Sequence, residues 1–215
     1  MFSLLRTWLV PLFLLGAGGA LAGCDEAESM TLGSGAAWPP EVGEPFPDVE
    51  LTNYDGRKFK ISDLKGKVVL MEPVGMTCPA CNALSGGNKR GGIENIQPQR
   101  GLGSLEDYLA DSSAGITLDH PDVVLVQILL YDLTMEAPDL ADVQVWAQHY
   151  GFDRNSNVYV AFSERDLRGE ASFRMIPGVQ LIDKDSVVRY DSTGHRPRHD
   201  LFSELLPQVP NLVRN

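Results

Sequence analysis

The apolar positions of the chain form short runs that predict strands separated by helices. Residues 68–71 and 123–130 are almost continuously apolar, as expected for strands that are buried on both faces of a sheet. Apolar side chains recur at helical spacing in residues 139–150, at Leu140, Val143, Ala147 and Tyr150. Further elements are predicted as short strands at 49–53 and 157–162, a hairpin at 179–182 and 187–190, and a last helix at about 200–206. This order predicts an α/β sandwich with a mixed central sheet flanked by helices.

The N-terminal residues follow a different pattern. One basic residue, Arg6, precedes a mostly apolar stretch from residue 7 to 21, which ends in Leu21-Ala22-Gly23-Cys24. The stretch is shorter than a spanning helix and is typical of a signal-peptide core. Its end resembles the bacterial lipobox, in which the peptide is cut before the cysteine and the thiol is then acylated; the alternative is an ordinary signal peptide with a chance cysteine. We therefore predict a lipoprotein signal peptide at 1–23 and lipidation of Cys24.

The predicted lipid defines a location and a domain organisation. Acyl chains on Cys24 would anchor the protein to a membrane, and Asp25 resembles an inner-membrane retention signal, so we expect a bacterial cell-envelope protein anchored to the inner membrane and facing the periplasm. Residues 24–40 are rich in Gly, Ser and Ala and predict a flexible tether. Residues 41–215 suffice for one domain, with an insertion at about 82–121 that is either a partner site or a disordered surface loop. Ser104 is a candidate N-cap for a short helix inside it.

The net charge of the chain narrows the classes of molecule that it could bind. The formal net charge is -11, which argues against nucleic acid, because nucleic-acid binding needs a basic face. The sequence has no phosphate-binding Gly-rich loop, no nucleophilic serine elbow and no Cys/His set with zinc spacing.

The cysteines carry the most informative motif. If Cys24 is lipidated, the only remaining thiols of the three cysteines are Cys78 and Cys81. A C-x-x-C pair closes too short a loop to act as a long-range staple, which leaves reversible redox chemistry or metal binding.

Several short motifs in a fixed order resemble one family. They are Gly43-Glu44-Pro45-Phe46-Pro47, Asp55-Gly56-Arg57-Lys58, Leu64-Lys65-Gly66-Lys67, Cys78-Pro79-Ala80-Cys81 and Ile176-Pro177-Gly178-Val179-Gln180-Leu181-Ile182-Asp183. Together they resemble the membrane-anchored thiol–disulfide oxidoreductases of the redoxin family. The resemblance implies a thioredoxin-like three-layer sandwich and an enzyme that exchanges disulfides with thiol- or disulfide-bearing extracytoplasmic proteins, without a cofactor.

The resemblance also implies roles for four catalytic residues. Cys78 would attack as a thiolate from a helix N-terminus, where the helix dipole lowers its pKa, and Cys81 would resolve the mixed disulfide. Pro177 would be a cis-proline beside the two sulfurs, or else a surface turn proline. Glu72 would be a buried acid that relays a proton to the second cysteine, or else an exposed residue at the end of a strand.

Two other activities use the same segment. Gly75-Met76-Thr77-Cys78-Pro79-Ala80-Cys81 resembles the G-M-T-C-x-x-C motif of heavy-metal-associated domains, and thioredoxin-fold copper-delivery proteins of oxidase assembly combine a cysteine pair with a distal histidine. The copper alternative therefore assigns Cu(I) to Cys78, Cys81, Met76 and His195, since soft thiolates and thioethers suit this ion.

The third activity is a peroxidase. Pro73-x-x-x-Thr77-x-x-Cys81 resembles the peroxiredoxin motif and makes Cys81 the peroxide-reacting residue. That family needs an arginine beside the thiolate, but Pro177 stands at the corresponding position and Arg174 is out of step. This departure favours dithiol exchange.

Overall fold

The computed structural model describes residues 29–32 and 37–215. The predicted signal peptide and Cys24 lie outside the described residues, as does most of the predicted tether. Within the described part of the chain, no helix is both long and apolar enough to cross a membrane.

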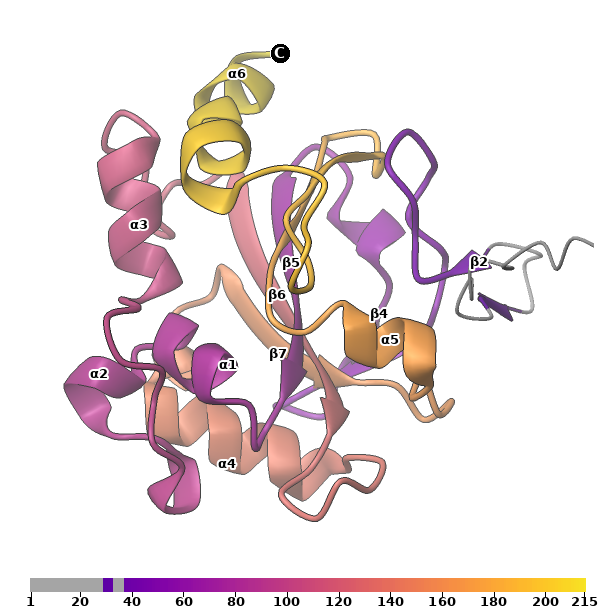
Figure 1. The fold of residues 1–215 in the computed structure, drawn as a ribbon. Helices are drawn as coiled ribbons and strands as arrows, with labels where there is room; N and C mark the ends of the chain where they lie inside the picture. The colour runs from indigo at the N-terminus through magenta and orange to yellow at the C-terminus, as the bar shows by residue number, and fades with distance from the viewer. Residues whose placement is uncertain (1–28, 33–36) are drawn as a thin grey trace, which may run out of the picture.

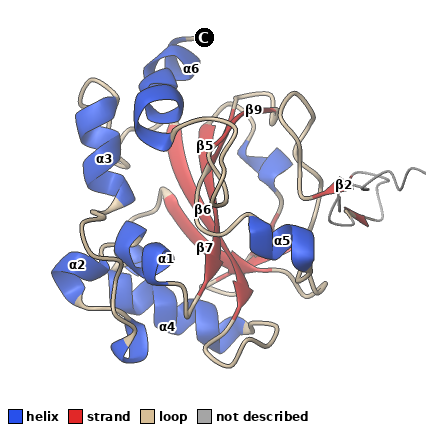
Figure 2. Cartoon of the chain, viewed as in Figure 1, coloured by secondary structure: helices blue, strands red, loops and turns tan. Residues whose placement is uncertain are grey.

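The centre of the fold is a seven-stranded sheet in the order β4-β3-β7-β6-β5-β8-β9. Figure 1 and Figure 2 show its strands running through the middle of the molecule, with helices around them. Its strands are β3 (Leu51–Asn53), β4 (Lys58–Phe59), β5 (Val68–Gly75), β6 (Val123–Tyr131), β7 (Val158–Phe162), β8 (Gln180–Ile182) and β9 (Val188–Asp191). Strands β5, β6 and β7 are parallel, and the other pairs are antiparallel. The predicted mixed sheet is therefore confirmed.

The two longest strands explain why the sheet lies inside the protein. Every residue of β5 and of β6 is buried. A strand covered on both faces needs apolar side chains throughout rather than at alternate positions, and both sequences meet this need apart from one polar residue each, Glu72 and Gln127. The parallel register places these two residues opposite each other.

The helices are α1 (Pro79–Leu84), α2 (Gly87–Arg90), α3 (Leu105–Ser112), α4 (Leu140–Tyr150), α5 (Glu170–Arg174) and α6 (Val209–Arg214). In Figure 1, α1 to α4 lie to the left of and below the central strands, and α5 lies to the right. The predicted helix at 139–150 is confirmed as α4, which begins after the N-cap Asp139 and ends at Tyr150, before the C-cap Gly151. Its buried face includes Trp146 in place of Leu140, which is 37% exposed.

The C-terminal helical region is longer than predicted. It begins after Asp200, as expected, but continues as a π-helical turn (Leu201–Leu205), a 3-10 turn (Leu206–Gln208) and then α6. Pro207 and Pro210 do not interrupt this region. Each instead occupies the first turn of a short helical segment, where a missing N–H costs no hydrogen bond.

The boundary predicted at residue 40 needs correction. The side chain of Trp38 is 1% exposed, and its indole N–H donates a 2.9 Å hydrogen bond to the Ser172 hydroxyl. The Gln180 amide also donates to the carbonyl of Pro40 at 3.0 Å. Trp38 belongs to β2 (Ala37–Trp38), which pairs with β1 (Met30–Thr31). Residues 37–40 are thus packed against the domain, because an indole gains more from burial than from a place in a polar linker.

The predicted insertion is built from regular elements. It contains the end of α1, then α2 and α3, and Ser104 caps α3 as predicted, its hydroxyl accepting from the Asp107 amide at 3.2 Å. The sequence raised two possibilities for this insertion, a partner site or a disordered surface loop. The structure shows an ordered segment rather than a disordered loop.

Candidate functional site

Strand β5 delivers the C-x-x-C motif to the start of α1. The strand ends at Gly75, where an added Cβ would lie 1.9 Å from the ring of Tyr131. Glycine is therefore required by the close approach of that ring rather than by its own conformation. The Met76 amide then donates to the carbonyl of Tyr131 at 3.1 Å, so β6 holds the loop just before Cys78.

Cys78 is the N-cap of α1. Its sulfur accepts a 3.1 Å hydrogen bond from the backbone N–H of Cys81, and Pro79 fills the first helical position, where no N–H is needed. A hydrogen bond from the Cys81 thiol, together with the backbone N–H groups of Cys81 and Ala80, lowers the pKa of Cys78 to about 7. A useful fraction of Cys78 is therefore thiolate near neutral pH, and the thiolate is the attacking form.

Cys81 has the opposite character. Its side chain is completely buried, whereas that of Cys78 is 9% exposed. Burial raises the pKa of the Cys81 thiol, and the neighbouring Cys78 and Glu72 raise it further. Both cysteines are free thiols. One thiol is thus prepared for attack while the other stays protonated behind it.

Glu72 is buried, as the resemblance implied, and not exposed at the end of the strand. Loss of water around its side chain raises the pKa of Glu72 to about 8, because a carboxylate is poorly tolerated without solvent. Its Oε2 accepts from the Gln127 amide at 2.8 Å, and its Oε1 has no hydrogen-bond partner among the described residues. Glu72 can therefore hold or release a proton close to neutral pH.

A buried polar network surrounds Glu72. The Gln127 amide nitrogen donates to Glu72 and also to the Ser85 hydroxyl, both at 2.8 Å. The Trp146 indole N–H donates to the Gln127 carbonyl oxygen at 2.9 Å, which fixes the orientation of this amide. The network connects β5, β6, α4 and the end of α1, the helix that carries both cysteines.

A cavity of about 540 Å³ opens beside Cys78. The Ile176–Pro177 peptide bond is cis, and Pro177 lines this cavity together with Cys78 and His195. The remaining lining residues are Pro79, Ala80, Gln99, Tyr131, Met135, Phe173 and Ile176. A partner sulfur can approach Cys78 from this cavity.

The metal ligands suggested by the sequence are brought together only in part. His195 shares the cavity with Cys78, but Met76 is 1% exposed and is not among the lining residues. In the part of the chain that the structure describes, no three His, Cys, Asp or Glu side chains are placed to hold one metal ion. The structure thus brings His195, but not Met76, to the cavity of Cys78.

The insertion is hydrogen-bonded directly to the loop that carries Met76 and Cys78. The buried amide of Asn82 donates to the carbonyls of Met76 and Cys78, at 3.0 and 2.9 Å, and its oxygen accepts from the Ile93 amide and the Tyr150 hydroxyl. The backbone N–H of Gln99 also donates to the carbonyl of Pro79 at 2.8 Å. The insertion thus supports the loop that positions Cys78 and contributes Gln99 to the cavity.

The sequence analysis did not identify several of these residues. Gln127 could have been identified as a candidate, because it is the one polar residue in a nine-residue buried strand. Asn82 and the cavity residues Met135 and Phe173 had none, since nothing in their local sequence indicates proximity to Cys78.

No protein-family model and no curated protein matches the sequence. Among solved structures, a candidate protein disulfide isomerase from Bacteroides thetaiotaomicron is 18% identical, with 82% of this chain and 92% of that chain covered and a TM-score of 0.52. A candidate electron transfer protein from Aquifex aeolicus is 16% identical, with 79% and 98% covered and a TM-score of 0.51. Copper-bound ScoI from Arabidopsis thaliana is 16% identical, with 81% and 99% covered and a TM-score of 0.49. At these identities the likeness concerns the fold, and the fold of this chain is thioredoxin-like.

Proposed function

We propose that the chain is a thiol–disulfide oxidoreductase that exchanges disulfides with extracytoplasmic proteins through Cys78 and Cys81. The observation that supports it is the contrast between the two thiols on α1. Cys78 caps the helix at the edge of a cavity, whereas Cys81 is completely buried one turn further on.

The exchange follows two balanced steps. The Cys78 thiolate attacks one sulfur of a partner disulfide, a mixed disulfide forms, and the other partner sulfur leaves as a thiolate. Cys81 then gives its proton to Glu72 in its carboxylate form and attacks the Cys78 sulfur. The second partner sulfur leaves as a thiolate, both partner thiolates take protons from water, and a Cys78–Cys81 disulfide remains. The same steps in reverse oxidise a partner dithiol.

The burial of Cys81 supports exchange over the peroxidase alternative. A peroxide-reacting Cys81 would need an exposed thiolate, yet its side chain is buried and its pKa is raised. Arg174, the nearest candidate for the required arginine, pairs with Glu170. The lipid on Cys24, which would hold the enzyme at the envelope, stays a prediction.

The test is a trapping experiment with a small disulfide-bonded test protein. Cys81→Ala should accumulate a mixed disulfide through Cys78, because the resolving thiol is missing, and Cys78→Ala should accumulate little or none. Non-reducing electrophoresis and peptide mass spectrometry identify the linked cysteine. Trapping through Cys81 that depends on added peroxide would support the peroxidase instead, and no trapping by either variant would overturn the proposal.

A further inference from the structure

Two exposed hydrophobic side chains lie beside the reactive cysteine. Of the described residues, five large hydrophobic ones are markedly exposed: Met135, Leu140, Val145, Phe173 and Phe202. Met135, at 48% exposure, and Phe173, at 40%, are the two that line the cavity of Cys78. Their burial by a partner would remove apolar surface from water, which contributes on the order of 1–2 kcal/mol for each side chain.

The two side chains come from separate segments and face the same cavity. Met135 lies in the loop after β6, and Phe173 lies in α5. The ring of Phe173 packs edge-to-face on Tyr131, with 5.7 Å between ring centroids. The Thr77 hydroxyl donates to the Met135 sulfur at 3.6 Å, which brings Met135 next to the residue that precedes Cys78.

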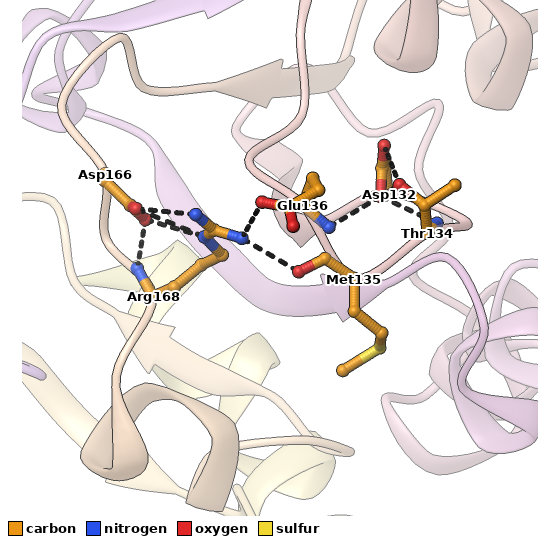
Figure 3. A network of polar contacts seen from close by, with 6 residues as sticks. All are labelled: Asp132, Thr134, Met135, Glu136, Asp166 and Arg168. Atoms are coloured by element: carbon orange, nitrogen blue, oxygen red, sulfur yellow. Dashed lines mark hydrogen bonds and ion pairs between the residues drawn. The ribbon is translucent and has the colours of Figure 1, made fainter.

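Hydrogen bonds and ion pairs fix the loop that carries Met135. Arg168 donates to the Met135 carbonyl at 2.8 Å and to the Glu136 carboxylate at 3.0 Å, and it also pairs with Asp166 at 2.9 Å. Asp132 accepts from the amides of Thr134 and Glu136. Figure 3 shows that the Met135 side chain extends away from this network.

The backbone conformation of Met135 also indicates that this loop has a fixed position. Its φ of 69° lies in the left-handed region, which residues other than glycine seldom adopt. An exposed apolar side chain that is fixed in place loses little conformational entropy when it binds. Arg168 is therefore a positioning residue for Met135.

The cavity offers little to a charged ligand. None of its lining residues is Lys, Arg, Asp or Glu, and His195 is the one basic side chain. A small anionic disulfide such as glutathione disulfide would find no arginine or lysine for its carboxylates there, and the net charge of -11 would repel it. A polypeptide disulfide with an apolar side chain next to its cysteine would instead bury that side chain against Met135 and Phe173.

We propose that Met135 and Phe173 are specificity-determining residues that select polypeptide disulfides flanked by a bulky apolar side chain. The proposal rests on the oxidoreductase function stated above and names the substrate class of the same site.

The experiment compares three disulfides as substrates of the full chain, with dithiothreitol added to return the chain to its dithiol form after each turnover and the uncatalysed rate subtracted. They are a pair of peptide disulfides of equal length and zero net charge, with either Phe or Ser beside each cysteine, and glutathione disulfide. We expect kcat/KM for the Phe peptide to exceed that for the Ser peptide by about 10-fold, which corresponds to about 1.4 kcal/mol, and glutathione disulfide to react most slowly. Met135→Ser with Phe173→Ser should remove the preference by raising KM for the Phe peptide alone.

Matched control variants separate this effect from a general loss of apolar surface. Val145 and Phe202 are 46% and 40% exposed but lie outside the cavity, so Val145→Ser with Phe202→Ser should keep the full preference. Arg168→Gln should weaken the preference through KM while the Ser peptide reacts as before.

The outcomes distinguish the two proposals. Equal rates for the Phe and Ser peptides, or glutathione disulfide as the fastest oxidant, would overturn the selectivity while leaving disulfide exchange intact. Failure of all three disulfides to oxidise Cys78 would overturn both.

Discussion

The first turn of α1 separates two regions of opposite character. On one side, the cavity beside Cys78 is lined by apolar side chains, and Met135 and Phe173 remain exposed to water. On the other side, Glu72, Gln127 and Ser85 are polar and almost fully buried. Globular proteins usually place these two kinds of side chain the other way round.

The inversion gives the two cysteines different chemistry. Backbone N–H groups and the Cys81 thiol stabilise charge on Cys78 at the cavity, which lowers its pKa to about 7. Burial disfavours charge on Cys81 and on Glu72, so both retain their protons to higher pH. In the proposed exchange, attack and resolution are therefore separated by solvent access, although the two sulfurs are one helical turn apart.

The largest effect is expected from Glu72→Gln, which removes the carboxyl group from the buried polar region. Proton transfer by a positioned side chain commonly contributes about 100-fold or more, so the release of a preformed mixed disulfide by Cys81 should slow by about 100-fold. Formation of that mixed disulfide by Cys78 should change much less. Stopped-flow measurement of the two steps separates them, and the exposed Glu106→Gln on α3 serves as control. Equal slowing of both steps would contradict the relay role.

The same substitution changes how stability depends on pH. The pKa of Glu72 is raised from its usual 4.5 to about 8 in the folded protein, so the folded state binds this proton more tightly than the unfolded state does. Its stabilising contribution is complete below pH 4.5 and decreases as the pH rises toward 8, by on the order of 4–5 kcal/mol for this group. Denaturant unfolding of the reduced protein should show this decrease in the wild type and a flatter profile in Glu72→Gln.

A smaller effect is expected from separating the insertion from the active-site loop with Asn82→Ala. The variant leaves the Met76 carbonyl, the Ile93 amide and the Tyr150 hydroxyl without the hydrogen bond that the Asn82 side chain supplies, and unsatisfied buried groups cost about 1–3 kcal/mol each before the structure relaxes. The free energy of unfolding should fall by about 2–4 kcal/mol, whereas the exposed Asn211→Ala in α6 should change it by less than about 0.5 kcal/mol. A fall no larger than that of the control would show that the insertion does not support the loop.

The smallest effect is expected from Met76→Leu combined with His195→Ala. In an exchange enzyme neither side chain reacts, so the rate of disulfide exchange should change by less than about threefold. A copper carrier would depend on both side chains as ligands of Cu(I). The check is a Cu(I) competition titration of the reduced protein beside a redox titration against glutathione. Tight stoichiometric Cu(I) binding that disappears in the double variant would contradict our assignment.

Much of the fold could be predicted because its signals are local. The continuous apolar runs predicted β5 and β6, the helical spacing of apolar residues predicted α4, and the order of short motifs predicted the thioredoxin-like fold. Leu140 was misplaced because a helical pattern by itself does not show where the apolar face of the helix meets the sheet. The C-terminal helical region continues beyond the predicted end at about residue 206, since Pro207 and Pro210 fall in the first turns of new helical segments.

The sequence by itself determined the candidate reactive groups: two vicinal cysteines at the start of a helix, an acid on a buried strand and a proline in the loop before another strand. Those residue types and spacings are local properties, so they can be read along the chain. Only the tertiary structure decided which side chains surround those groups. Gln127, Asn82, Met135 and Phe173 reach the site from four separate segments, and the packing of the sheet, the insertion and α5 determines which of them meet water and which are hidden from it.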